Sequence, residues 1–174
     1  MSAPDAALSR RGPLELAEEG PRAEPERRCV CFQVGAEWFA LPIPCVREIQ
    51  PLPPPVRVPN ARPEILGIVN LRGRVLTLLA TAAPLRVRRA SPPSHCLVLD
   101  LGEPDLYVGL AIQGAGEIVS VPLSAIQPPP GEDASGLEGL FEADGRAVGL
   151  IDLARLYAPL LAEWGIEPNR LPAR

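Results

Sequence analysis

From Cys29 onward the chain is a succession of short apolar runs separated by Gly and Pro, and this pattern restricts it to a β fold. The runs have the length of strands, several of them alternate apolar and polar residues, and turn-forming residues lie between most of them. In chain order they read CVCFQV, EWFALPI, CVREI, ILGIVNL, VLTLLA, HCLVLDL, LYVGLAI, GEIVSV, GLEGLF and AVGLIDL. We therefore expect an all-β body of about ten strands.

Only the C-terminal end has a helical pattern. Asp152 is a candidate N-cap, because a short acidic side chain can accept the first free N–H groups of a helix. Pro159 lies inside the pattern and would kink or shorten the helix. The apolar residues at helical spacing are Leu153, Leu156, Tyr157, Leu160 and Leu161. The sequence therefore predicts one short C-terminal helix.

The apolar runs repeat once along the chain. Two similar five-stranded units would close into two small barrels with a shared core between them, which removes exposed strand edges. The residues 86–94, RVRRASPPS, are the expected crossover between the units. The matching positions are Glu48 with Glu117, Gly67 with Gly139, and Gly73-Arg74 with Gly145-Arg146.

Composition sets the expected limits of the domain. Residues 1–28 carry nearly balanced charge and no hydrophobic periodicity, so we expect a disordered N-terminal tail there. The folded domain is expected over residues 29–162, and residues 163–174 are expected to form a C-terminal tail.

Six of the 23 prolines lie in the segment from Gln50 to Pro63. This segment is expected to be a stiff, extended loop that fixes two strands, although it could also be a PxxP ligand for an aromatic groove.

Charge and aromatic content argue against a nucleic-acid partner. The chain has 17 basic and 21 acidic residues, a net charge of −4, and only 4% aromatic residues. It lacks both the basic surface and the stacking rings that a barrel binding single-stranded nucleic acid would need.

No apolar run approaches about 18 residues, so we expect no direct membrane insertion. The N-terminus lacks the apolar segment of a secretory signal, and we expect a cytoplasmic protein.

Signatures of catalysis and cofactor binding are absent from the sequence. With His95 as the single histidine, a zinc-protease pattern is excluded and a His-based triad would depend on one residue. The G-A-G at residues 114–116 lacks the third glycine of a dinucleotide fingerprint, because Val119 stands there. Glu48 and Glu117 could be an acid–base pair, but their equivalent places in the repeat favour structural or surface roles. We expect no enzyme activity and no cofactor.

The four cysteines are expected to stay reduced in a cytosolic chain. One alternative is a thiolate zinc site that includes His95. No C-x-x-C pair is present, so we favour small buried hydrophobes on strands and expect no metal site. The cysteines are Cys29, Cys31, Cys45 and Cys96.

An ordered set of motifs resembles the CheW-like domain family. The first half contains P-I-P-x-V-R-E-I, a Pro-rich loop with V-P-N, and I-L-G-I-V-N-L-R-G-R-V. The second half contains V-G-L-A-I at 108–112, E-I-V at 117–119, I-Q-P-P at 126–129 and G-L-I-D-L at 149–153. The resemblance extends from about residue 29 to about residue 162, and G-x-x-N-L-R-G is its most specific part.

The resemblance implies an all-β fold of two SH3-like five-stranded barrel subdomains around a shared core. Members of this family are non-catalytic adaptors of bacterial chemosensory arrays. The implied partners of this chain are the cytoplasmic tip of a methyl-accepting chemoreceptor and the regulatory domain of a CheA-type histidine kinase. The adaptor would couple the two by holding them in a defined geometry.

The resemblance also assigns roles to particular positions. Glu48 and Arg72 are predicted to form an ion pair or a shared hydrogen-bond network across adjacent strands, at the lip of a receptor groove. An apolar floor for a receptor helix is predicted from Ile43, Val46 and Leu71. With Asn70, these residues complete the implied receptor- or kinase-binding set. Gly67 and Gly73 are predicted to be structural, as bulge or turn positions that need glycine geometry. The other glycines predicted to be structural are Gly109, Gly139 and Gly145.

Three positions depart from the family pattern. Thr77 stands where Pro is usual, Ala80 where Asp is usual, and Gln113 where Asp is common. The departures leave a second hypothesis open, in which the chain is a divergent regulator of a pathway other than motility, or one that binds only one partner.

Overall fold

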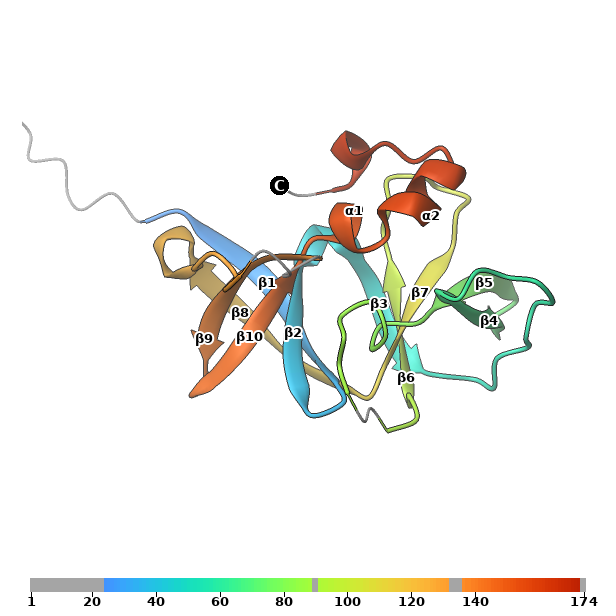
Figure 1. Ribbon diagram of the computed structural model, residues 1–174, viewed down its shortest axis with the longest axis horizontal. Helices are drawn as coiled ribbons and strands as arrows, with labels where there is room; N and C mark the ends of the chain where they lie inside the picture. Colours follow the sequence, from blue (N-terminus) through green and yellow to red (C-terminus); the bar gives the residue numbers. More distant parts are fainter. Residues whose placement is uncertain (1–23, 89–90, 132–135, 173–174) are drawn as a thin grey trace, which may run out of the picture.

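The structure, a computed structural model, describes residues 24–88, 91–131 and 136–172 (Figure 1). The described residues form ten strands in two five-stranded sheets, together with short helices. The strands are β1 (Glu26–Val34), β2 (Glu37–Pro42), β3 (Val46–Pro51), β4 (Ile65–Leu71), β5 (Arg74–Leu79), β6 (His95–Leu99), β7 (Val108–Ile112), β8 (Gly114–Pro122), β9 (Leu137–Ala143) and β10 (Arg146–Ile151). The helices are η1 (Ile43–Cys45), η2 (Leu123–Ala125), α1 (Leu153–Leu156), α2 (Ala158–Glu163) and η3 (Pro168–Arg170).

The two sheets are built from both halves of the chain. Their strand orders are β8-β1-β2-β10-β9 and β3-β6-β7-β5-β4. Each sheet therefore inserts a hairpin from one half between strands of the other half: β1–β2 lies between β8 and β10, and β6–β7 lies between β3 and β5. On one side of each hairpin the pairing is antiparallel (β1–β8, β3–β6), and on the other it is parallel (β10–β2, β5–β7). The prediction that each half closes its own barrel was wrong. The repeat identifies equivalent strands, but it does not indicate which half supplies the strands that flank a given hairpin.

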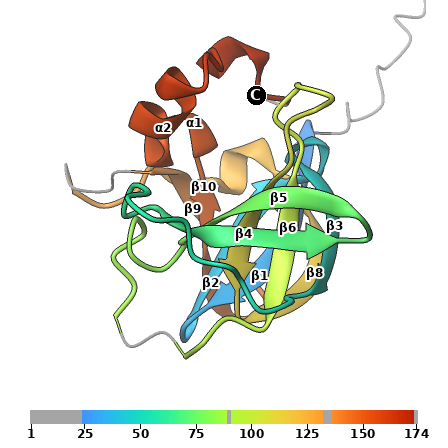
Figure 2. The ribbon, with the colours of Figure 1, turned by 90° about the vertical axis from the view of Figure 1, so that its right-hand side faces the viewer.

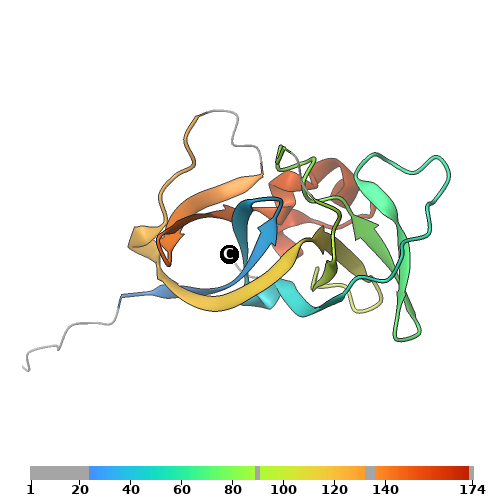
Figure 3. The same cartoon turned by 90° about the horizontal axis from the view of Figure 1, so that it is seen from below.

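The exchange of strands also changes the role of the predicted crossover. The segment 86–94 connects β5 to β6, which belong to the same sheet, and its residues 89–90 lie outside the described part. The chain passes between the sheets at η1, which follows β2, and again between β7 and β8. In Figure 3 each sheet curls into a barrel, with the first sheet on the left and the second on the right.

Each barrel is closed by one isolated bridge. Val56 and Ile68 exchange two backbone hydrogen bonds of 2.8 Å in the second barrel, and Gln127 and Leu140 do the same in the first. Val56 belongs to the Pro-rich loop that follows the edge strand β3, and Ile68 lies on the opposite edge strand β4. The loop therefore joins the two edges of the second sheet, as Figure 2 shows face-on.

The buried side chains form one central core and a smaller core inside each barrel, which confirms the predicted shared core. Residues from both sheets and from the C-terminal helices meet in the central core, including Phe32, Leu41, Leu97, Leu110 and Tyr157. All four cysteines are buried and unpaired, as favoured from the sequence. Burial raises the pKa of the Cys29 and Cys31 thiols to about 11 and that of Cys96 to about 12.

The C-terminal residues pack over the junction between the two barrels (Figure 1). Asp152 caps α1, with Oδ1 accepting the Arg155 N–H at 3.1 Å. The helical stretch breaks at Tyr157 and resumes as α2 with Pro159 in its first turn, so the predicted interruption is confirmed. The Tyr157 hydroxyl donates to the Ala80 carbonyl at 2.7 Å, which ties the helices to the second barrel.

The ends of the domain differ from the expected limits. β1 begins at Glu26, inside the expected N-terminal tail, while residues 1–23 lie outside the described part. At the other end Ile166 is buried, so the segment after residue 162 packs onto the domain. None of the helices among the described residues is long and apolar enough to span a membrane.

Candidate functional site

The N-L-R-G sequence builds a tight hairpin between β4 and β5. Arg72 and Gly73 have φ values of 51° and 83°, the left-handed pair typical of a two-residue type I′ turn. Asn70 Oδ1 accepts the Gly73 N–H at 2.9 Å and so holds the turn. The Asn70 side chain is thus engaged within the hairpin, and the Arg72 side chain projects from its tip with 77% of its surface exposed.

Arg72 and Glu48 form the ion pair that the resemblance implies, with 3.6 Å between Nη1 and Oε2. The prediction that they lie on adjacent strands was wrong, because Glu48 is on β3 and Arg72 follows β4, the two opposite edges of the second sheet. Curling of the sheet brings these edges together, so the pair spans the closure of the barrel. An exposed pair of this kind stabilises a fold by roughly 0–1 kcal/mol, so stability alone does not explain it.

The corresponding end of the first barrel has the opposite electrostatic character. Asp144 and Gly145 form the equivalent turn, with φ values of 51° and 70°. Glu117, the equivalent of Glu48, lies close to Asp144, and a hydrogen bond and the charge of Asp144 raise the Glu117 pKa, although the charge of Arg146 opposes this shift. Equivalent turns therefore carry an attractive pair in one barrel and a pair of carboxyl groups in the other.

The same type of cation–π contact occurs at equivalent positions of the two barrels. Arg74 lies 4.9 Å from the centre of the Tyr107 ring, and Arg146 lies 4.5 Å from that of Trp38. Arg74 Nη1 also donates to the Tyr107 hydroxyl at 2.8 Å. The match between Gly73-Arg74 and Gly145-Arg146 thus extends to the aromatic partner, which confirms the structural equivalence of the repeats.

The structure separates the two glutamates that the sequence analysis considered as an acid–base pair. Glu48 and Glu117 belong to different barrels, so they do not form an acid–base pair. His95 Nδ1 is 2.8 Å from Ser94 Oγ, and its neighbour Cys96 is buried. Among the described residues, no group of three or more His, Cys, Asp or Glu side chains could hold a metal ion.

Comparison with known proteins places this geometry in a family. The model of the CheW-like domain matches residues 28–159. The chain belongs to the CheW-like domain family. A probable chemotaxis protein CheW of Rhizobium etli is 32% identical over 143 residues, covering 79% of this chain and 92% of that protein. The chemotaxis protein CheW of Rhizobium meliloti is 31% identical over 136 residues, covering 75% of this chain and 87% of that protein.

A solved structure shares the fold of this CheW-like domain. The scaffolding protein TtCheW from Thermoanaerobacter tengcongensis superposes with a TM-score of 0.66 at 22% sequence identity. The match covers 76% of this chain and 93% of that one. Together with the two barrels and their common core, it confirms the fold class expected from the sequence.

The predicted apolar floor of this CheW-like domain is only partly at the surface. Ile43 and Val46 are half-buried in η1 and at the start of β3, and Val46 packs against the central core. Leu71 is only 8% exposed and lies in the core of the second barrel, so it is not available to a partner. Side chains alternate along a strand, and Leu71 therefore points inward while its neighbour Asn70 points outward.

Several exposed apolar residues near the same features escaped the sequence analysis. Val75 is 62% exposed and pairs with Asn70 beside the Arg72 turn, while Val56 is 65% exposed at the barrel closure. Strand alternation around Leu76 was the signal that could have placed Val75 outside. In the first barrel Ile118 is 56% exposed next to Glu117. The other large apolar residues exposed on the described surface are Val58, Leu66 and Leu123.

A shallow pocket of about 410 Å³ lies where the N-terminal part of β1 meets η1 and η2. Ile43 and Leu123 give it apolar surface, and Arg27 and Arg28 give it positive charge. Arg27 forms an ion pair with Glu138 of β9. The predicted site residue Ile43 thus lines a pocket at the start of the link from the first barrel to the second.

Three of the five predicted structural glycines occupy tight positions, whereas Gly73 and Gly145 lie in open turns. Gly67 lies at a bulge in β4 with φ of 151°, and a Cβ there would come within 3.0 Å of the Val56 carbonyl carbon. Gly139 is its equivalent in β9, where a Cβ would meet the Gln127 carbonyl oxygen at 2.8 Å. Gly109 lies in β7 against Cys96 and Leu76. Both bulges therefore let the bridging loop approach the edge strand closely.

The three departures from the family pattern have structural partners. Thr77 N–H donates to the Tyr107 carbonyl at 3.0 Å, and the Ala80 N–H donates to the Glu64 carbonyl at 2.8 Å. Gln113 links two loops, since its Oε1 accepts the Gly35 N–H at 2.9 Å and its Nε2 donates to the Ser91 carbonyl at 2.6 Å. An Asp at 113 could accept the first bond but could not donate the second.

Proposed function

We propose that this chain is an adaptor of a bacterial chemosensory system that acts in the cytoplasm. It binds the cytoplasmic tip of a methyl-accepting chemoreceptor and the regulatory domain of a CheA-type histidine kinase, and it performs no catalysis itself. Family membership supports the adaptor role, because the relatives that match over most of the chain are chemotaxis proteins. The identity of both partners is the part that binding experiments must establish.

The Glu48–Arg72 pair is the observation that carries the proposal. It is exposed, it spans the closure of the second barrel, and it sits on a turn built at the cost of a positive φ at Arg72. A non-glycine residue in the left-handed region is disfavoured by about 1 kcal/mol, while an exposed ion pair returns little stability. Such an arrangement is typical of a residue held in place for contact with a partner.

The apolar residues around the pair supply contact area for a helix. Val75 is exposed beside the Arg72 turn, Val56 is exposed at the bridge to Ile68 farther along the same closure, and Ile43 lines the pocket between β1, η1 and η2. A partner helix would place apolar side chains on these residues and an acidic or polar group near Arg72. The Arg72 turn and the pocket lined by Ile43 lie on one domain whose barrels share a core, so partners bound to this domain are held in a fixed relation.

Coupling requires no chemistry from the adaptor. If one signalling state of the receptor makes better contacts in the complex with the kinase, the kinase population shifts with the state of the receptor. The size of the effect equals the difference in binding free energy between the two states. The adaptor contributes by fixing the relative position of receptor and kinase, so that the two receptor states differ in the contacts they make with the kinase.

The proposal is tested by measuring the binding of a purified receptor cytoplasmic fragment to the wild-type chain and to two turn variants. Arg72→Ala is expected to weaken binding about tenfold or more, since arginine is one of the residue types that most often dominate the affinity of an interface. Asp144→Asn occupies the same turn position in the other barrel, and as the matched control it is expected to change affinity by less than about twofold. Unchanged affinity in folded Arg72→Ala would overturn the Arg72 assignment. Receptor binding without kinase binding would favour the single-partner alternative.

A further inference from the structure

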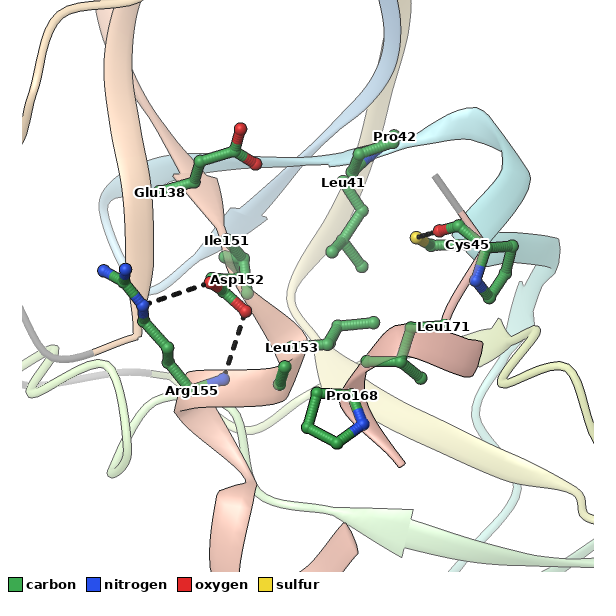
Figure 4. Close-up of a pocket in the computed structure, with 12 residues that line it drawn as sticks. Leu41, Pro42, Cys45, Glu138, Ile151, Asp152, Leu153, Arg155, Pro168 and Leu171 are labelled. Atoms are coloured by element: carbon green, nitrogen blue, oxygen red, sulfur yellow. Dashed lines mark hydrogen bonds and ion pairs between the residues drawn. The ribbon is translucent and has the colours of Figure 1, made fainter. Parts of the chain in front are cut away.

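The chain does not end at α2 but returns across the junction of the barrels. Ile166 is buried at 4% exposure and fixes the end of the helical region. Residues 167–172, which we name the C-terminal strap, then lead back toward η1 and include the short helix η3. Figure 4 shows Pro168 and Leu171 of the strap facing Leu41, Ile151 and Leu153.

The strap contacts the domain at several points, including a close approach of the Arg170 carbonyl to Gly102. Leu171 packs against the central core, and the Cys45 thiol donates to the Pro172 carbonyl at 2.8 Å. Arg170 Nη1 lies 3.1 Å from Glu103 Oε1 in the loop between β6 and β7. Cys45 belongs to η1, the connection from the first barrel to the second. The strap is therefore fastened both to the second barrel and to the link between the barrels.

The packing beneath the strap is incomplete. A cavity of about 220 Å³ lies between the strap and the floor formed by Leu41, Ile151 and Leu153 (Figure 4). Over this partly open space, which Glu138 and Asp152 also line, the strap is not in close contact with the floor and gains few dispersion contacts from this side. Asp152 and Arg155 at the rim bind each other rather than the strap, with 3.3 Å between Oδ2 and Nε.

The backbone of the strap is also weakly tied. Among the described residues, the one backbone N–H of the strap with a backbone acceptor is that of Arg170, which donates to Glu167 within the strap itself. No strand pairing includes residues 167–172. A segment with few buried apolar contacts and few backbone bonds to the rest of a domain opens at a lower free energy than the domain unfolds.

We propose that the C-terminal strap is a latch, which detaches as a unit from the folded domain and uncovers an apolar groove at the junction of the barrels. Leu41, Ile151 and Leu153 form the floor of this groove, and Cys45 lies in its wall. When the latch is closed it fixes η1, the turn that leads into β3. The latch is a property of the fold, and it holds whether or not the proposed partners bind.

The four cysteines provide an internal measure of latch opening. Cys45 lies under the strap, whereas Cys29 and Cys31 lie inside the first barrel and Cys96 inside the second. Burial raises the pKa of the Cys45 thiol to about 11, so in the closed form this thiol is unreactive. Reaction at Cys45 alone therefore reports the strap, and reaction at all four thiols reports unfolding of the domain.

The test treats the native full-length chain with a small disulfide reagent and follows each cysteine by peptide mass spectrometry. Cys45 is expected to react at least about tenfold faster than the other three. Leu171→Ala is expected to raise the Cys45 rate about tenfold by removing apolar contact, and Arg170→Ala about two- to fivefold by removing an exposed ion pair. Arg155→Ala changes an arginine at the same rim that does not hold the strap, and it is expected to leave the Cys45 rate unchanged.

Two results would overturn the latch. One is a common rate for all four cysteines in the wild-type chain, which would mean that Cys45 reacts only when the domain unfolds. The other is an unchanged Cys45 rate in both Arg170→Ala and Leu171→Ala. Because Arg170 is exposed, Arg170→Ala keeps the test decisive even where Leu171→Ala destabilises the whole domain.

Discussion

Glu48 and Arg72 face each other across the closure of the second barrel, 3.6 Å apart, although their strands occupy opposite edges of the sheet. The barrel has no direct ladder between β3 and β4, and the Val56–Ile68 bridge joins these edges through the Pro-rich loop. Among the described residues, the ion pair is therefore a side-chain contact across a seam that the backbone closes at one bridge. That position allows a partner to reach both charges at once.

Exchanging the two charges separates the pair itself from the contact with a partner. The double variant Glu48→Arg, Arg72→Glu keeps an opposite-charge pair, and its unfolding free energy in urea should stay within about 1 kcal/mol of the wild type. Affinity for the receptor fragment should remain lost, as in Arg72→Ala, because the cation is no longer at the tip of the turn. Recovery of wild-type affinity in the double variant would mean that the pair acts by shaping the domain, not by touching the receptor.

Gly67 should tolerate substitution less well than Gly73, although both have positive φ. Gly67→Ala adds a Cβ against the Val56 backbone and is expected to destabilise the domain by about 2 kcal/mol or more, since backbone strain and a clash add. Gly73→Ala has no heavy atom within 4 Å of the added carbon, so about 1 kcal/mol of strain alone is expected. Chemical denaturation of the two variants gives the comparison, and equal losses would contradict the close approach of the loop at Gly67.

Much of the fold, but not its connectivity, could be predicted from the sequence. Strand runs, the Asp152 cap, the break near Pro159 and the repeated turns at Gly73 and Gly145 are local properties, so their residues suffice to predict them. The exchange of strands between halves depends on which copy of a unit a hairpin pairs with, and identical patterns carry no information about that choice. The packing of the chain beyond residue 162 was missed because Trp164, Ile166 and Leu171 are isolated apolar residues with no periodic pattern.

The candidate site was predictable to a similar extent. The family motif placed Glu48 and Arg72 together, but it also placed Leu71 on the surface, where alternation with Asn70 already indicated an inward side chain. The exposed Val56 and Ile118 were missed because they lie where each sheet closes into a barrel, in a loop and on an edge strand. Whether an apolar residue is buried there depends on how the sheet curls, which the local sequence does not indicate. Gln113 was noted only as a departure, and its two hydrogen bonds to distant loops could not be inferred from neighbours in sequence.

The hydroxyl of Tyr157 should contribute measurably to stability. It is buried at the junction of the barrels and donates to the Ala80 carbonyl, so Tyr157→Phe leaves that acceptor without its partner and is expected to cost about 1–2 kcal/mol. Tyr107→Phe removes a hydroxyl that contacts Arg74 in solvent and serves as the control, with an expected cost below about 1 kcal/mol. Urea unfolding of both variants measures the difference. A larger loss in Tyr107→Phe would contradict the structural role given to Tyr157.

The carboxyl pair of the first barrel should make stability depend on acid pH. Asp144 raises the folded-state pKa of Glu117 above its unfolded value, so the contribution of this group is present below the unfolded pKa and is lost as pH rises through the folded pKa. Asp144→Asn keeps the turn, because Asn also adopts the left-handed region. It should lower the Glu117 pKa and increase stability relative to the wild type as pH rises through the acid range.

The pKa of Glu117 is measured by NMR titration of its side-chain carboxyl in the wild type and in Asp144→Asn. Glu142→Gln, which removes an exposed carboxylate of β9, controls for the change in net charge. An equal shift of the Glu117 titration in both variants would indicate a general effect of charge rather than the contact with Asp144.

The central claim is that one chain holds a receptor and a kinase domain at the same time. Light scattering coupled to size-exclusion chromatography measures this directly, with the full chain mixed with a receptor cytoplasmic fragment and a CheA-type kinase regulatory domain. We predict a ternary species whose mass includes all three components and which is lost in Arg72→Ala, while the binary species with the kinase domain persists. A wild-type chain that elutes alone in the presence of both partners would contradict the account.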